Sequence, residues 1–203
     1  MKPVLCSILA GTLILSIASA GMAVESKKAE KKGIMSKTQD EMVKIAKSAA
    51  PAFISDNATI MVPGPDGKLK TVKEGTNGFT CVPDLSMQEV PDPACADKAG
   101  TQWLMDVINK AEKPSNDVPG IGYMAKGGWH WEKDGKVIMD PATPGAKRVK
   151  EPPHWMIFWP FTSTETMLPT MPGEFKTYIM YDGTPYAHLM IYQNPRELKQ
   201  GKK

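Results

Sequence analysis

Short apolar segments separated by turn signals make up most of this 203-residue chain, and they limit the folds that it can adopt. Helical patterns are predicted over residues 38–50, where Thr38 and Glu41 fit a capping box, and over residues 97–113. About seven short strands follow one another through turns, without the regular alternation of strands and helices that is typical of parallel sheets. We therefore expect an α+β fold, with an antiparallel sheet of short strands and hairpins, two amphipathic helices and one disulfide.

The N-terminus has the three parts of a signal peptide. Lys2 precedes an apolar run over residues 4–17, and small residues around Ala20 and Ala23 follow it. The run is shorter than the roughly 20 apolar residues that span a bilayer, so a cleaved segment is favoured over a membrane anchor. We expect a signal peptide over residues 1–23, although cleavage after Ala20 also fits, and a periplasmic or secreted protein.

The remaining chain has the length of one domain. Removing residues 1–23 from 203 leaves 180 and takes away only the charge of Lys2, so the net charge falls from +3 to +2. We expect a flexible charged leader over residues 24–37, a single α+β domain over 38–195 and a flexible basic tail over 196–203. A charge so near neutral argues against nucleic acid as a partner, and no second long apolar run suggests an integral membrane segment after cleavage.

The cysteines predict one disulfide. Cys6 leaves with the predicted signal peptide, and Cys81 and Cys95 remain. In an oxidising compartment such a pair is most simply a structural bridge. A bridge across a loop of about 15 residues contributes roughly 3 kcal/mol in the chain-entropy model. A redox pair and a thiolate metal site are the alternatives, but redox pairs usually have C-x-x-C spacing, and two cysteines alone make a poor metal site.

Two His-x-Met motifs suggest a metal site. His154 and Met156 lie in one predicted strand, His188 and Met190 in another, and alternate residues of a strand project from the same face. Imidazole nitrogen and thioether sulfur suit copper(I), and the four groups would converge if the two strands were neighbours. The alternative is a place in the core, since Met fills irregular gaps and a buried His is often satisfied by hydrogen bonds.

The aromatic residues supply weaker candidates. Trp129 and Trp131 are predicted to be exposed and to line a binding cleft, and His130 lies between them in a glycine-rich stretch. A second aromatic cluster is expected to pack in the core, because aromatic side chains bury large apolar areas. Its members are Trp155, Phe158, Trp159 and Phe161.

Common catalytic signatures are missing from the sequence, which has no G-x-S-x-G, P-loop, G-x-G-x-x-G, H-E-x-x-H or C-x-x-C-H motif. The leading hypothesis is a non-catalytic binding or structural module without a cofactor, whose partner is an unknown small molecule, metal or protein. The second is a periplasmic copper-binding protein that uses His154, Met156, His188 and Met190. The third is a hydrolase or isomerase with a His–carboxylate pair in a cleft.

Five segments carry a resemblance to known sequences: residues 74–81, 92–97, 122–124, 153–156 and 183–190. They resemble a group of uncharacterised secreted bacterial proteins, and the likeness runs from about residue 49 to residue 191. The resemblance implies an exported bacterial protein in which the cysteine pair, His154 and His188 are common features. It implies no activity, and residues 127–151 depart from the shared pattern.

Overall fold

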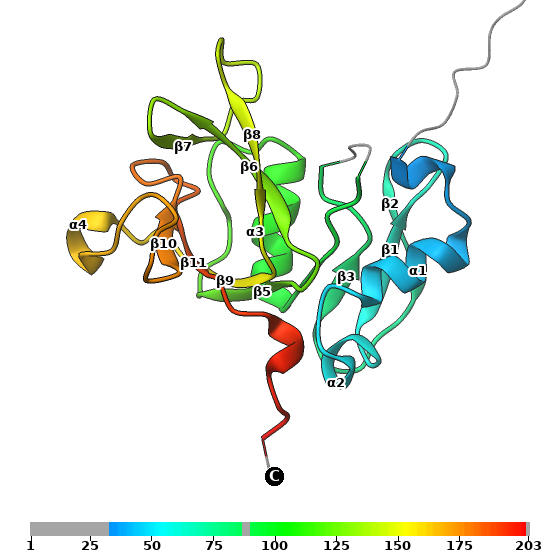
Figure 1. Cartoon of the computed structure of the whole chain (residues 1–203). Coiled ribbons are helices and arrows are strands. Elements are labelled where there is room, and N and C mark those ends of the chain that lie inside the picture. The colour runs from blue at the N-terminus through cyan, green and yellow to red at the C-terminus, as the bar shows by residue number, and fades with distance from the viewer. Residues whose placement is uncertain (1–32, 87–89, 202–203) are drawn as a thin grey trace, which may run out of the picture. The chain divides into compact units, whose positions relative to one another are not determined.

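The computed structural model describes residues 33–86 and 90–201 (Figure 1). The predicted signal peptide over residues 1–23 and most of the predicted leader lie outside these residues. Within the described part, no helix is both long enough and apolar enough to cross a membrane.

Helices and strands together form an α+β fold, as the sequence predicts. The described helices are α1 (Gln39–Lys47), α2 (Ala52–Ser55), α3 (Lys98–Ile108) and α4 (Ser163–Thr166), with 3-10 helices η1 (Gly33–Ser36) and η2 (Pro195–Glu197). The described strands are β1 (Thr59–Pro63), β2 (Leu69–Lys73), β3 (Thr80–Val82), β4 (Ala94–Ala96), β5 (Gly120–Met124), β6 (Gly128–Lys133), β7 (Lys136–Ile138), β8 (Lys147–Glu151), β9 (His154–Phe158), β10 (Thr177–Met180) and β11 (His188–Ile191).

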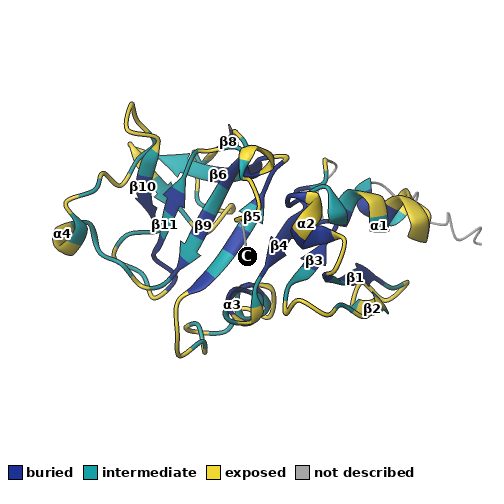
Figure 2. Ribbon diagram, turned by 90° about the horizontal axis from the view of Figure 1, so that it is seen from below, coloured by how far each residue is buried: buried dark blue, intermediate teal, exposed yellow. Residues whose placement is uncertain are grey.

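The large sheet has eight strands in the order β10-β11-β9-β5-β4-β3-β1-β2 (Figure 2). The expectation of a purely antiparallel sheet is wrong at one place, because β1 and β3 run parallel. The cause is that β2 forms a hairpin on the outer side of β1. The chain then returns past β1 and adds β3 to its other side in the same direction as β1.

The two faces of the large sheet carry separate hydrophobic cores. On one face, α3 packs through Trp103 and Leu104 against strand residues that include Phe158. On the other face, α1 and α2 cover the half of the sheet that contains β1, β3 and β4. The helix α3 approaches β5 closely because two glycines meet there. A Cβ atom on Gly120 would lie 2.2 Å from the backbone nitrogen of Gly100.

Local capping signals set the starts of the two longer helices. Thr38 and Glu41 form the predicted capping box at α1, and the Asp97 side chain accepts a 2.8 Å hydrogen bond from the Gly100 backbone at α3. The helix α3 ends at Ile108, earlier than predicted, because the chain turns at Lys110, which has a positive φ of 56°.

The packed domain extends beyond both predicted boundaries. Gly33–Ser36 form η1, and Ile34, placed by the sequence in a flexible leader, is only 1% exposed in the core beneath α1. Near the other end, the Arg196 guanidinium donates a 3.0 Å hydrogen bond to the carbonyl of Ser48, so the predicted tail begins with an ordered contact.

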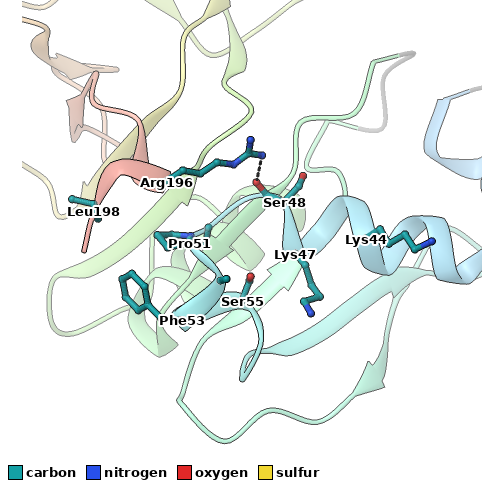
Figure 3. Close-up of a pocket in the computed structure, with 10 residues that line it drawn as sticks. Lys44, Lys47, Ser48, Pro51, Phe53, Ser55, Arg196 and Leu198 are labelled. Carbon is teal, nitrogen blue, oxygen red and sulfur yellow. Dashed lines mark hydrogen bonds between the residues drawn. The ribbon is translucent and has the colours of Figure 1, made fainter. Parts of the chain in front are cut away.

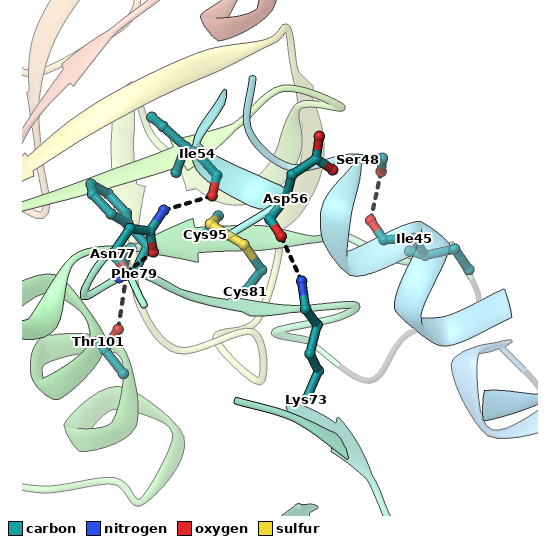
Figure 4. The surroundings of a disulfide bond; sticks show 11 residues. Ile45, Ser48, Ile54, Asp56, Lys73, Asn77, Phe79, Cys81, Cys95 and Thr101 are labelled. Carbon is teal, nitrogen blue, oxygen red and sulfur yellow. Dashed lines mark hydrogen bonds between the residues drawn. A yellow bond between two sulfur atoms is a disulfide. The ribbon is translucent and has the colours of Figure 1, made fainter. Parts of the chain in front are cut away.

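The predicted disulfide is confirmed (Figure 4). Cys81 on β3 lies directly opposite Cys95 on β4, and both are fully buried in the core beneath α1 and α2. The amide of Asn77 donates a 2.7 Å hydrogen bond to the Ile54 carbonyl close by. The bridge therefore joins neighbouring strands at the base of the loop that separates them.

Residues 127–151 contain more strand than the sequence predicts. They form a three-stranded sheet in the order β7-β6-β8, which we call the small sheet. β6 and β7 are joined by a hairpin turn at Asp134 and Gly135. Both residues have a positive φ, 50° and 72°, as in the two-residue turns whose twist suits antiparallel strands.

Candidate functional site

The two predicted His-x-Met strands are neighbours in the large sheet. Met156 on β9 lies directly opposite Met190 on β11, and both are buried. The same register places His154 at one end of the ladder and His188 at the other. Four strand residues separate their levels, which is about 13 Å. The structure therefore brings the two Met side chains together and keeps the two His side chains apart.

The Nδ1 atom of each of the two predicted histidines already has a hydrogen-bond partner nearby. The His154 Nδ1–H donates to the Pro152 carbonyl at 2.8 Å, and the His188 Nδ1–H donates to the Tyr186 carbonyl at 2.9 Å. The His188 ring also packs edge-on against Trp103, with ring centroids 4.8 Å apart. Copper binding by these four residues stays a prediction. The strand register does not bring the two His rings and the two Met sulfurs to one point.

A buried carboxylate, Glu151 at the end of β8, is the centre of a polar network. Its Oε1 atom accepts hydrogen bonds from Tyr178 at 2.6 Å, from His130 Nδ1 at 2.9 Å and from Tyr192 at 3.1 Å. Its Oε2 atom lies 3.7 Å from His154 Nε2, which has no hydrogen-bond partner among the described residues. These residues come from both sheets, so the network joins the small sheet to the large one.

His130 lies between two carboxylates. Its Nδ1 contacts Glu151, and its Nε2 contacts Glu132 at 2.6 Å on the same strand. Burial by itself lowers the pKa of His130, but the hydrogen bonds to Glu151 and Glu132 outweigh this effect and raise it. The protonated ring therefore donates in both directions.

The electrostatics keep Glu151 ionised. Burial by itself raises the pKa of its carboxyl, but the hydrogen bond from His130, the electrostatic interaction with His154 and the hydrogen bond from Tyr178 lower it to about 2. Burial and the neighbouring Glu151 charge in turn raise the pKa of Tyr178. The network is thus an ionised, buried carboxylate that accepts hydrogen bonds from two tyrosine hydroxyls and from the His130 imidazole.

The network contains the His–carboxylate pairing that acid–base chemistry requires, but it lies inside the protein. His130 is 1% exposed and Glu151 is 3% exposed, whereas Glu132 at the edge of the network is 28% exposed. A general base must come within hydrogen-bond reach of the proton that it removes. The arrangement therefore suits a structural clamp better than a reaction centre.

The outward face of the small sheet carries other residue types than the inward face that contacts the network. Along β6 and β8, His130 and Glu151 point inward, so the alternate residues project from the opposite face. We call this opposite surface the Trp-Lys face. It consists of Trp129, Trp131, Lys133, Lys136, Ile138, Arg148 and Lys150.

The Trp-Lys face combines aromatic rings with positive charge. The Arg148 guanidinium lies 4.1 Å from the ring centroid of Trp129, which is a cation–π contact. No outward position on the three described strands β6, β7 and β8 is Asp or Glu. The acidic residues of these strands, Glu132 and Glu151, belong to the inward face, and Asp134 lies in the hairpin turn.

A groove of about 350 Å³ adjoins this face, and we call it the Trp129 groove. Its walls bring together the end of α1, the turn before β6 and the residues that precede β4. It is lined by Lys37, Ile45, Ser48, Val90, Pro91, Pro93, Lys126, Gly127, Gly128, Trp129 and Lys150. The three lysines are exposed, and no salt bridge to them occurs within the described part of the chain. Among the residues that the structure describes, the lining is thus apolar and cationic, with no acidic side chain.

A second groove, of about 540 Å³, lies on the other side of Ser48 (Figure 3). Its cationic side chains either have a partner already or point away from one another. Lys47 pairs with Asp56 at 2.5 Å, Arg196 binds the Ser48 carbonyl, and Lys44 extends along α1 away from Arg196. The Trp129 groove is therefore the stronger candidate for an anion.

The sequence pointed to only part of these two features. Trp129 and Trp131 were expected to be exposed and to line a binding cleft. Both lie on the Trp-Lys face and are partly buried, and of the two only Trp129 lines the groove. Glu151, Tyr178 and Tyr192 were not singled out. His130 contacts Glu151, and the alternation of His130 and Glu132 could have indicated a polar strand face there. That signal was usable only if residues 128–133 had been recognised as a strand.

Comparison with known proteins adds no relationship. No family model, no curated protein and no solved structure matches this chain. Within the described residues, no group of three or more His, Cys, Asp and Glu side chains is arranged to hold a metal ion.

Proposed function

We propose that this chain is an exported, non-catalytic binding module that holds an anionic ligand on the Trp-Lys face and in the adjoining Trp129 groove. The observation that carries the proposal is the composition of this surface. Two tryptophans are interleaved with four cations on one face of a small sheet, without a carboxylate among the outward strand positions. Such a surface attracts negative charge and offers flat apolar rings for contact.

The proposed location outside the cytoplasm has two supports. The N-terminal sequence has the pattern of a cleaved signal peptide. The Cys81–Cys95 bridge is of the kind that persists in oxidising compartments and is rare in the cytosol. A periplasmic or secreted bacterial protein fits both observations.

A binding role is favoured over catalysis because the titratable cluster is shielded. Glu151 and His130 are almost fully buried and already satisfy one another. The accessible surface beside them offers lysines, an arginine and tryptophans, which suit binding more than proton transfer. The network then serves to hold β6 and β8 rigid behind the binding face.

The test is calorimetric titration of the full chain, purified after export, with polygalacturonate, inorganic phosphate and oligothymidylate as anionic probes. Dextran serves as the uncharged polymer. We expect at least one anion to bind, more weakly as salt increases, and dextran not to bind. Changing Lys150→Glu reverses a charge in the groove and should weaken binding by at least about tenfold, or about 1.4 kcal/mol.

Lys70→Glu is the matched control, because Lys70 is exposed on β2, an edge strand of the large sheet, and belongs neither to the Trp-Lys face nor to the lining of the Trp129 groove. It changes the net charge by the same amount and should leave the affinity unchanged. If all three anions fail to bind, or if both variants lose affinity equally, the proposed function is wrong.

A further inference from the structure

We infer that the anionic ligand is an acidic polysaccharide that lies along β6, from the hairpin end of the Trp-Lys face into the Trp129 groove. This inference rests on the proposed function and specifies its ligand. It comes from the spacing of the cations and the placement of the two indole rings.

The cations are distributed along a line and do not surround one point. Lys133 and Lys136 pair at the hairpin end of the small sheet, and Trp129 and Lys150 pair at the other end. From Lys133 to Trp129 the strand advances about 13 Å. A small anion would use converging donors, whereas a row of separated charges matches a chain that carries one charge on each unit.

The groove continues this line beyond the sheet. Trp129 and Lys150 belong both to the Trp-Lys face and to the groove lining, which also contains Lys126 and Lys37. The nearby Glu41 carboxylate is engaged by the backbone and hydroxyl of Thr38. Among the described residues, neither the Trp-Lys face nor the groove lining contains an acidic side chain, so a chain lying on the face can continue into the groove without charge repulsion from these residues.

The two tryptophans favour sugar rings as the repeating units. Trp129 and Trp131 are two positions apart on one strand face, about 7 Å along the strand. Arg148 lies over the Trp129 ring and restricts its movement. The flat C–H surface of a sugar ring packs on an indole face that Arg148 does not cover, while carboxylates at the ring edge reach the flanking lysines.

Polysaccharide is favoured over single-stranded nucleic acid, which also combines rings with regular negative charge. Proteins that bind nucleic acid depend mainly on dense patches of Lys and Arg, whereas the formal net charge of this chain is only +3. The proposed export also places the protein where acidic polysaccharides are the more accessible polymers.

The experiment compares oligogalacturonates of increasing length with oligothymidylates of equal charge, using the full exported chain and calorimetry. We expect affinity to rise by at least about tenfold from galacturonate monomer to the longest oligomer, and each oligothymidylate to bind more weakly than its sugar counterpart. Lys136→Glu and Lys37→Glu lie at opposite ends of the line, and each should weaken binding of the long oligomer by about tenfold. Lys70→Glu should not.

The possible outcomes separate this inference from the function on which it rests. Equal affinity for monomer and long oligomer would overturn the extended ligand while leaving an anion-binding site. Tighter binding of oligothymidylate would replace polysaccharide by nucleic acid. Failure of every anion to bind would remove the proposed function itself. These variants change only exposed side chains, and unchanged circular dichroism would show that each one folds.

Discussion

Glu151→Ala is expected to lower the free energy of unfolding by about 3–5 kcal/mol, since removing one member of a buried ion pair leaves the other uncompensated. The Glu151 Oε1 atom accepts from Tyr178, Tyr192 and His130, of which Tyr178 and His130 are buried away from water and Tyr192 is partly buried. Alanine removes the common acceptor and leaves a cavity between the two sheets. Urea unfolding followed by tryptophan fluorescence, with the disulfide intact, measures the loss.

Two further variants show whether the cause is the buried charge. Glu132→Ala removes the other carboxylate that contacts His130, but Glu132 is partly exposed, so we expect a loss of only about 1 kcal/mol. Glu151→Gln keeps an acceptor oxygen and adds an amide that can face His154 Nε2, which lacks a partner among the described residues. We expect its stability to lie between those of the wild-type protein and Glu151→Ala. Equal losses for Glu151→Ala and Glu132→Ala would show that the network is not centred on Glu151.

The fold was predictable where the signal is local. The helix starts at Thr38 and Asp97 depend on side chains within three residues of the backbone groups that they cap. The disulfide could be predicted from the expected oxidising compartment and from the two cysteines that remain after cleavage of the signal peptide. The parallel pairing of β1 with β3 was not predictable in the same way, because it depends on where a distant strand joins the sheet. Such pairings leave no periodicity in the sequence of either strand.

The small sheet was underestimated for a different reason. Residues 147–151 are mostly charged, and residues 127–133 begin with two glycines, so neither segment has the apolar character expected of a strand. In the structure this composition has a physical cause. One face of each strand meets the polar network around Glu151, and the other carries the cations of the Trp-Lys face. A strand with two polar faces looks like a loop to any method that searches for apolar alternation.

Acidification should destabilise the protein through His188, with a loss of roughly 3 kcal/mol between pH 6.5 and pH 4. Burial lowers the pKa of His188 to about 4, against smaller opposing effects that include its hydrogen bond to Tyr186. The unfolded chain binds a proton near pH 6.5, while the folded chain resists it until about pH 4. Stability therefore rises with pH across this window and falls as the pH drops. The ring packs against Trp103, Phe158 and Tyr181, where a charge has no counter-ion in contact.

The measurement is urea unfolding of the wild-type protein and of His188→Gln at several pH values between 6.5 and 4. The glutamine cannot titrate and can still donate to the Tyr186 carbonyl, so the stability difference between the two proteins should shrink as the pH falls. His130 has the opposite sign, because its raised pKa gives stability that is present below pH 6.5 and is lost at higher pH. The contribution of His130 to stability is therefore constant between pH 6.5 and pH 4. His130→Gln should keep the dependence of the unfolding free energy on pH that His188→Gln loses. A slope unaffected by His188→Gln would mean that His188 is already protonated in the folded protein, which is incompatible with the aromatic packing around its ring.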